Sequence, residues 1–191
     1  VQVNLLQTYH VGTSQITKEM MVARDKSRAE HDATKADENP LWIYALKQYN
    51  ESNCAEFLIQ AQDELGLDVN VLLLIGWLAA SNLTIDIQAI MHARAFDWQK
   101  NIVKPLRKIR RQAKEYAPED FYQKILALEL SAEKQQLQDF YQLSLSFEHG
   151  KQGFKLAVKT GCEEYLKLQG KSLEESWLQA LIEHLQPNKL D

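Results

Sequence analysis

The stretch DVNVLLLIGWLAA, residues 68–80, stands out in a chain that is otherwise markedly polar. Ten consecutive residues, Val71 to Ala80, carry neither a formal charge nor an amide side chain. At helical pitch, such a run covers every face of a helix, which predicts a helix enclosed by other helices. A membrane-spanning helix needs about 20 predominantly apolar residues, roughly twice this length. The stretch therefore predicts a core helix and no transmembrane segment.

Helix boundaries are signalled on both sides of this segment. Asp68 is placed to cap the N-terminus of the core helix, and Gly66 is placed to end the preceding helix in a left-handed conformation. Asn39-Pro40 combines a cap with a proline at the first helical position, which predicts another helix start. Pro105 lies inside a long helical pattern, and it predicts a kink or a break near Lys104 because proline lacks a backbone donor.

Two further patterns predict capping boxes, in which two side chains satisfy free amides at a helix start. Asn53 is followed three residues later by Glu56, and Ser172 is followed at the same spacing by Glu175. The expected consequence is that helices begin directly after Asn53 and Ser172.

The composition favours a single all-α domain. Hydrophobic residues make up 45% of the 191 residues, and only seven glycines and four prolines are present. We predict one compact multi-helix bundle of six to eight helices, with the 69–80 helix at its centre. Residues 39–191 are expected to form this domain. Residues 1–38, rich in alternating charge, are expected to form a flexible polar N-terminal extension.

The net charge and the cysteines are those of a cytoplasmic protein. The formal net charge is −4, which indicates no global attraction to nucleic acid or to anionic membranes. The first residues show neither a basic segment nor an uninterrupted apolar segment, so no signal peptide is expected. Cys54 and Cys162 stand far apart and are predicted to be reduced, partly buried thiols.

Three stretches resemble a known family in their order and spacing. NPLWIYAL (39–46), LGLDVNVLLLIGWLAA (65–80) and DWQKNIVKPLRKIRR (97–111) are similar to the DUF2390 family of uncharacterised proteobacterial proteins. The resemblance covers residues 39 to about 111 well and the rest more loosely. Seven motif residues, interpreted as structural, carry it: Pro40, Trp42, Asp68, Asn70, Trp77, Trp98 and Pro105. The resemblance implies no activity and no catalytic residues.

Residues 100–114 form a basic segment in this acidic chain. Seven of the fifteen residues are basic and none is acidic: Lys100, Lys104, Arg107, Lys108, Arg110, Arg111 and Lys114. On a regular helical wheel an apolar face faces inward and the basic residues face outward, with Arg110 at the edge. The inward positions are Trp98, Ile102, Leu106, Ile109 and Ala113. Such a basic face binds phosphates, an acidic protein or an anionic headgroup, or pairs with acids on neighbouring helices, and the sequence leaves these readings open.

Enzymatic and metal chemistry find little support in the sequence. The five histidines are scattered, and the Asp63-Glu64 pair lacks the Glu-x-x-His partners of two-metal helical bundles, so no metal and no cofactor are predicted. No nucleophile elbow or phosphate-binding glycine loop occurs. Glu148-His149-Gly150 is the one predicted loop that combines acid–base capability with mobility, and no catalytic residue is predicted.

Three functional hypotheses follow. The first is a small, non-enzymatic cytoplasmic protein that binds an acidic protein partner, chiefly through Arg107, Lys108, Arg110 and Arg111. The second is association with nucleic acid or the ribosome through the basic segment 100–114. The third is an enzyme with a cryptic pocket. A homo-oligomer is compatible with each of the three.

Overall fold

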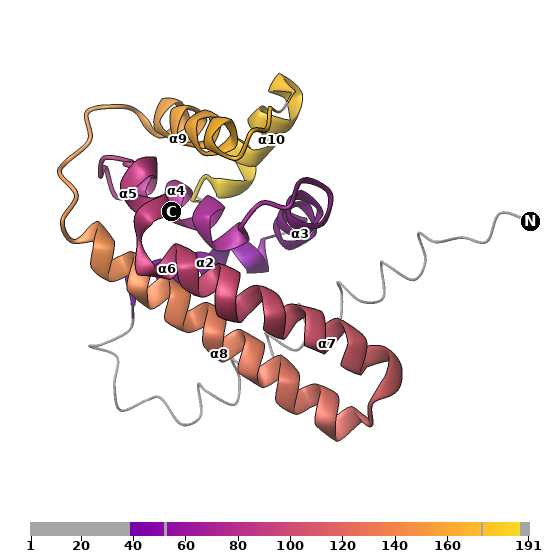
Figure 1. Cartoon of the computed structure of the whole chain (residues 1–191). Coiled ribbons are helices and arrows are strands. Elements are labelled where there is room, and N and C mark those ends of the chain that lie inside the picture. Colours follow the sequence, from indigo (N-terminus) through magenta and orange to yellow (C-terminus); the bar gives the residue numbers. More distant parts are fainter. Residues whose placement is uncertain (1–38, 52, 173, 188–191) are drawn as a thin grey trace, which may run out of the picture.

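The chain folds as an all-α protein. The computed structural model describes residues 39–51, 53–172 and 174–187, and the predictions made for residues 1–38 lie outside these ranges. The predicted compact all-α fold around a buried central helix is confirmed (Figure 1). The helices are α2 (Pro40–Asn50), α3 (Cys54–Leu65), α4 (Val69–Ala80), α5 (Ile87–His92), α6 (Arg94–Trp98), the π-helical segment η1 (Gln99–Val103), α7 (Lys104–Tyr116), α8 (Glu119–Ser144), α9 (Phe154–Leu168) and α10 (Glu175–Leu185).

Helix α4 is the centre of the core. Val71, Leu73, Leu74 and Ile75 are completely buried, because α4 contacts α2, α3, α8, α9 and α10. In Figure 1, α9 and α10 lie on one side of α4 and the long α7–α8 pair lies on the other. No helix in the described part of the chain is long and apolar enough to cross a membrane.

The boundary signals around α4 are confirmed. The Asp68 carboxylate accepts a hydrogen bond of 3.0 Å from the Asn70 amide, as an N-cap does. Gly66 ends α3 with a φ of 62°, a conformation that glycine adopts without a steric penalty. The Asn39 side chain accepts from the amide of Leu41, and α2 begins at Pro40 as predicted.

Both predicted capping boxes are wrong. Asn53 precedes α3, but its φ of 66° is left-handed and its side chain makes no capping bond. A residue whose side chain caps a helix typically has an extended backbone. The left-handed backbone of Asn53 does not have this geometry, and its side chain does not cap the backbone amides of α3. Helix α10 begins at Glu175 with Glu174 as its cap residue, which places Ser172 too early to cap it.

The helical run from Arg94 to Tyr116 changes its hydrogen-bond pattern just before Pro105. The Lys104 amide donates to the carbonyl of Gln99, five residues earlier, instead of four. Proline has no N–H, and its ring crowds the carbonyl four residues before it, which favours a wider turn at this point. The predicted irregularity near Lys104 is therefore a π turn within a continuous helical run. This turn holds one extra residue, so every later side chain is rotated by about 100°.

The two cysteines give a first testable prediction. Cys54 and Cys162 are fully buried and unpaired, and burial raises the pKa of each thiol to about 12. Only the thiolate reacts with disulfide reagents. At pH 8, neither thiol of the folded protein is therefore expected to react with Ellman's reagent within minutes. Both thiols are expected to react at once when the protein is unfolded in guanidinium chloride. Rapid labelling of either thiol in the folded protein would contradict this packing.

Candidate functional site

The basic segment does not face outward as a whole. Arg110 is 7% exposed, whereas Ile109, which was expected to pack inward, is 45% exposed. The π turn causes this difference, because it rotates α7 by the angle of one residue relative to a regular helical wheel. Arg107 and Arg110 consequently turn towards α8. The expectation that Arg107 faces outward, that Arg110 lies at the edge of the basic face and that Ile109 packs inward is therefore wrong.

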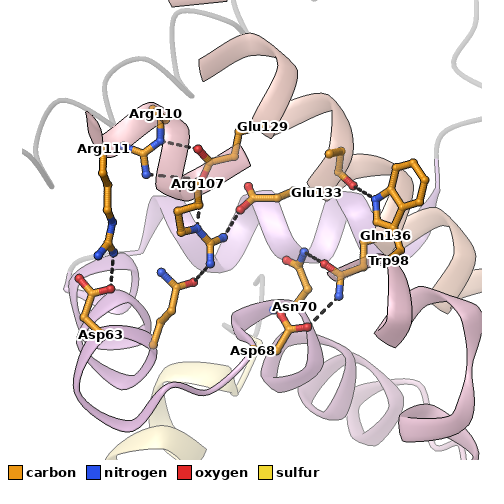
Figure 2. A network of polar contacts seen from close by, with 12 residues as sticks. Asp63, Asp68, Asn70, Trp98, Arg107, Arg110, Arg111, Glu129, Glu133 and Gln136 are labelled. Carbon is orange, nitrogen blue, oxygen red and sulfur yellow. Dashed lines mark hydrogen bonds and ion pairs between the residues drawn. The ribbon is translucent and has the colours of Figure 1, made fainter. Parts of the chain in front are cut away.

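A charged cluster joins α7 to α8 (Figure 2). One carboxylate oxygen of Glu129 accepts a hydrogen bond from Arg107 Nε, with 3.0 Å between nitrogen and oxygen. The other carboxylate oxygen of Glu129 accepts a hydrogen bond from Arg110 Nε. Arg107 also donates to Glu133 of α8 and to Gln62 of α3. Two arginines thus meet two glutamates, and the formal charges cancel. Burial alone would lower the pKa of Arg107, but Glu133 and Glu129 raise it overall.

A second polar cluster joins α4 to α8 and is uncommonly well buried. Gln136 Nε2 donates to Asp68 Oδ2 at 2.7 Å, and Gln136 Oε1 accepts from Asn70 Nδ2 at 2.8 Å. The backbone amide of Asp68 donates to the Tyr165 hydroxyl. Burial raises the pKa of Asp68, and the hydrogen bonds from Gln136 and from the Asn70 amide oppose that shift. This arrangement ties the motif residues Asp68 and Asn70 to α8.

The motif tryptophans lie half-buried and also meet α8. Trp42 lies under the Lys134 ammonium at 5.4 Å, Trp77 packs edge-on against Tyr141 at 5.7 Å between ring centres, and Trp98 Nε1 donates to the Ala132 carbonyl at 3.0 Å. Each of these tryptophans comes from a different helix. The contacts connect α2, α4 and α6 to α8 between Ala132 and Tyr141.

An open groove lies between α3 and α7. Its volume is about 390 Å³, and its lining residues are Gln62, Asp63, Lys104, Arg107, Lys108, Arg111, Gln112 and Glu115. Arg111 donates to Asp63 across it. Lys104 and Lys108 are exposed one turn apart on the α7 wall, and neither forms an ion pair with a residue that the structure describes. The groove therefore gathers Lys104, Arg107, Lys108 and Arg111 from the predicted basic face. Lys100 and Lys114 are exposed outside its lining.

Several residues of these clusters were not anticipated from the sequence. Glu129 and Gln136 occupy buried positions of α8, where the periodicity otherwise places apolar side chains such as Leu126 and Phe140. A charged or amide residue at an apolar helical position was the available signal. Asp63 was considered as a metal ligand, whereas the structure pairs it with Arg111. No described residues form a group of three or more His, Cys, Asp or Glu that could hold a metal ion.

The loop that carries His149 is held against the segment after α4. The Thr84 amide donates to the Glu148 carbonyl, and the Gly150 amide donates to the Asn82 carbonyl, each at 2.8 Å. Leu83 and His149 form an isolated β-bridge between these hydrogen bonds. The His149 side chain is exposed, and the groove between α3 and α7 does not include it.

Comparison with known proteins identifies one family. The model of DUF2390, described as a protein of unknown function, matches residues 40–140. The matched region runs from the first residue of α2 into α8, and it contains the groove, the charged cluster and the side chains of Asp68, Asn70 and Gln136, whereas Tyr165 lies beyond it. No curated protein and no solved structure is significantly similar to the chain.

Proposed function

The chain belongs to the DUF2390 family, and we propose that its helical domain, residues 39–191, acts in the cytoplasm by binding an acidic protein segment in the groove between α3 and α7. The observation that carries this proposal is the pair Lys104 and Lys108. Both ammonium groups are exposed beside an open groove, and no described carboxylate is paired with them. Unpaired cations that line one wall of a groove attract carboxylates and raise the rate of encounter with an acidic partner.

The contact residues differ from those expected on the sequence alone. Arg107 and Arg110 are already ion-paired with Glu129 and Glu133, so their role is to hold α7 against α8. Lys104, Lys108 and Arg111 remain to meet the partner. Lys100 in η1 and Lys114 near the end of α7 carry the positive charge further along the same helical run.

The groove chemistry favours a protein partner over nucleic acid. Asp63 and Glu115 line the groove together with the cations, and two carboxylates repel the continuous phosphates of a nucleic-acid strand. Gln62 and Gln112 supply amide groups that can hydrogen-bond a peptide backbone. A non-enzymatic binding role accounts for these features without requiring a reacting group.

Reversing the two lysines tests this proposal. The variant Lys104→Glu with Lys108→Glu is expected to lose at least about ten-fold in affinity for the acidic partner, because both attractions become repulsions. The free energy of unfolding is expected to change by no more than about 0.5 kcal/mol, since both side chains are exposed. The measurement is an affinity capture from native cytosol at low salt, with and without nuclease, followed by titration of the captured protein.

A matched control carries the same charge change on another helix. Lys155→Glu with Lys167→Glu alters two exposed lysines of α9, and this variant is expected to retain the partner. A partner that is lost equally from both variants would refute the groove as the binding site. Capture that disappears with nuclease, together with a steep dependence on salt, would replace the acidic protein by nucleic acid or the ribosome.

A further inference from the structure

The Arg111–Asp63 ion pair spans the open groove between α3 and α7. Arg111 comes from α7 and Asp63 from α3, so the pair joins the two walls (Figure 2). The Arg111 side chain is 54% exposed and the Asp63 side chain is 26% exposed. The guanidinium is thus bound to a carboxylate of its own chain while it remains accessible from solvent.

This pair differs from the neighbouring charged cluster in how readily a carboxylate can be exchanged. Glu129 is almost completely buried, and its removal leaves Arg110 without a described carboxylate partner in a desolvated site, whereas Arg107 keeps Glu133. Asp63 can return to water when Arg111 takes another carboxylate, because both groups already contact solvent. Exchange at an exposed pair costs little, since such pairs contribute little to stability.

The position of Arg111 on α7 matches that of the two exposed lysines. Lys104, Lys108 and Arg111 follow one another at spacings of four and three residues, which places them on one side of the helix. Their separations along the axis are about 6 and 4.5 Å. Carboxylates at the same spacings on a partner helix would meet all three cations. The carboxylate that meets Arg111 can do so only by replacing Asp63.

We propose that Asp63 is a built-in competitor for the acidic partner, and that a carboxylate of an acidic partner helix displaces it from Arg111. This inference rests on the proposed function, because it concerns the same groove. In the free protein Asp63 holds Arg111 and weakens binding to partners that offer too few carboxylates. A partner with acidic residues at helical spacing also contacts Lys104 and Lys108, and it displaces Asp63 from Arg111.

The test is a double-mutant cycle with a defined probe. The probe is a fluorescein-labelled helical peptide whose glutamates repeat at spacings of three and four residues, and its affinity is measured by fluorescence anisotropy. Asp63→Asn keeps the size of the side chain and frees Arg111, and it is expected to bind the peptide about three-fold more tightly than the wild type. In the background of Arg111→Gln the same Asp63→Asn change is expected to raise the affinity clearly less, because only the general repulsion by the Asp63 charge is then removed.

Two controls separate competition from general electrostatics. Glu115→Gln removes another negative charge from the groove lining without freeing Arg111, and it is expected to change affinity less than Asp63→Asn does. The melting temperature of each variant is compared with that of the wild type to show that the fold is intact. An equal gain from Asp63→Asn with and without Arg111 would overturn the competitor role, because general charge removal would explain it.

The remaining outcomes distinguish this inference from the proposed function. If Asp63→Asn binds like the wild type while the Lys104 and Lys108 reversal weakens binding, the groove is the site but Asp63 is not a competitor. If the peptide binds to none of these variants, nor to the wild type, both the acidic-partner proposal and the competitor role are wrong.

Discussion

Glu129→Gln is expected to lower the free energy of unfolding by about 3–5 kcal/mol, the usual effect of leaving a buried charge without its partner. The Glu129 carboxylate accepts hydrogen bonds from Arg107 and from Arg110, and all three side chains are largely removed from solvent. Glutamine preserves the shape but offers one acceptor oxygen and no charge. Arg110 then has no carboxylate partner within the described ion pairs, and the main interaction that offsets its desolvation is lost, although Tyr122 still interacts with it.

Chemical denaturation followed by circular dichroism measures this effect. Glu133→Gln is the matched control, because it changes the next carboxylate of the same cluster, which among the described ion pairs is bound to one arginine, Arg107, and has a side chain that is 21% exposed. Its effect is expected to be about 1 kcal/mol, close to that of a partly exposed ion pair. If the two variants were equally destabilised, burial would not be the reason for the importance of Glu129.

Removing both charges tests the same explanation in the opposite direction. Arg110→Met with Glu129→Met deletes one positive and one negative group and leaves Arg107 paired with Glu133. Replacement of a complete buried pair by apolar residues is often neutral or stabilising. The double variant is therefore expected to be markedly more stable than Glu129→Gln, although it lacks more native contacts. This variant also keeps the test decisive if Glu129→Gln does not fold.

The elements that were predicted correctly depend on local chemistry. The enclosed position of α4 follows from the apolar run of residues 71–80, and its start follows from the hydrogen bond that Asp68 makes two residues ahead. Asn39-Pro40 and Gly66 likewise act within a few residues of themselves. The Asn53 capping box failed because the left-handed backbone at Asn53 belongs to the turn between α2 and α3, which the pattern Asn-x-x-Glu does not specify.

The candidate site was predicted only in part because its decisive feature is a change of helical phase. A regular wheel places Ile109 inside and Arg110 at the edge of the outer face, whereas the π turn before Pro105 reverses their burial. Proline signals an irregularity, but a kink, a break and a π turn lead to different faces. The pairing of Arg107 with Glu129 also joins two residues that are 22 positions apart in the sequence, and no local pattern encodes it.

Gln136→Leu is expected to destabilise the domain by about 2–4 kcal/mol at neutral pH, because it leaves two buried polar groups without their partner. Gln136 is completely buried, and its amide both donates to Asp68 and accepts from Asn70. Leucine has a similar volume, so the loss reflects hydrogen bonding rather than a cavity. Gln135→Leu, the same change at the adjacent exposed residue, is expected to cost less than about 1 kcal/mol.

The effect of Gln136→Leu is also expected to depend on pH through Asp68. Burial raises the pKa of Asp68 above its ordinary value of 3.8, so the carboxylate favours folding most when it is protonated, and this contribution is lost as the pH rises through the folded-state pKa. The Gln136 hydrogen bond opposes the shift by stabilising the ionised form. Its removal therefore raises the pKa of Asp68 further, and the penalty is expected to grow with rising pH as Asp68 ionises in the folded protein. Denaturation curves of the variant and the wild type over a series of pH values above 3.8 measure the penalty, and a penalty that is constant over the whole series would show that Gln136 does not act on the charge of Asp68.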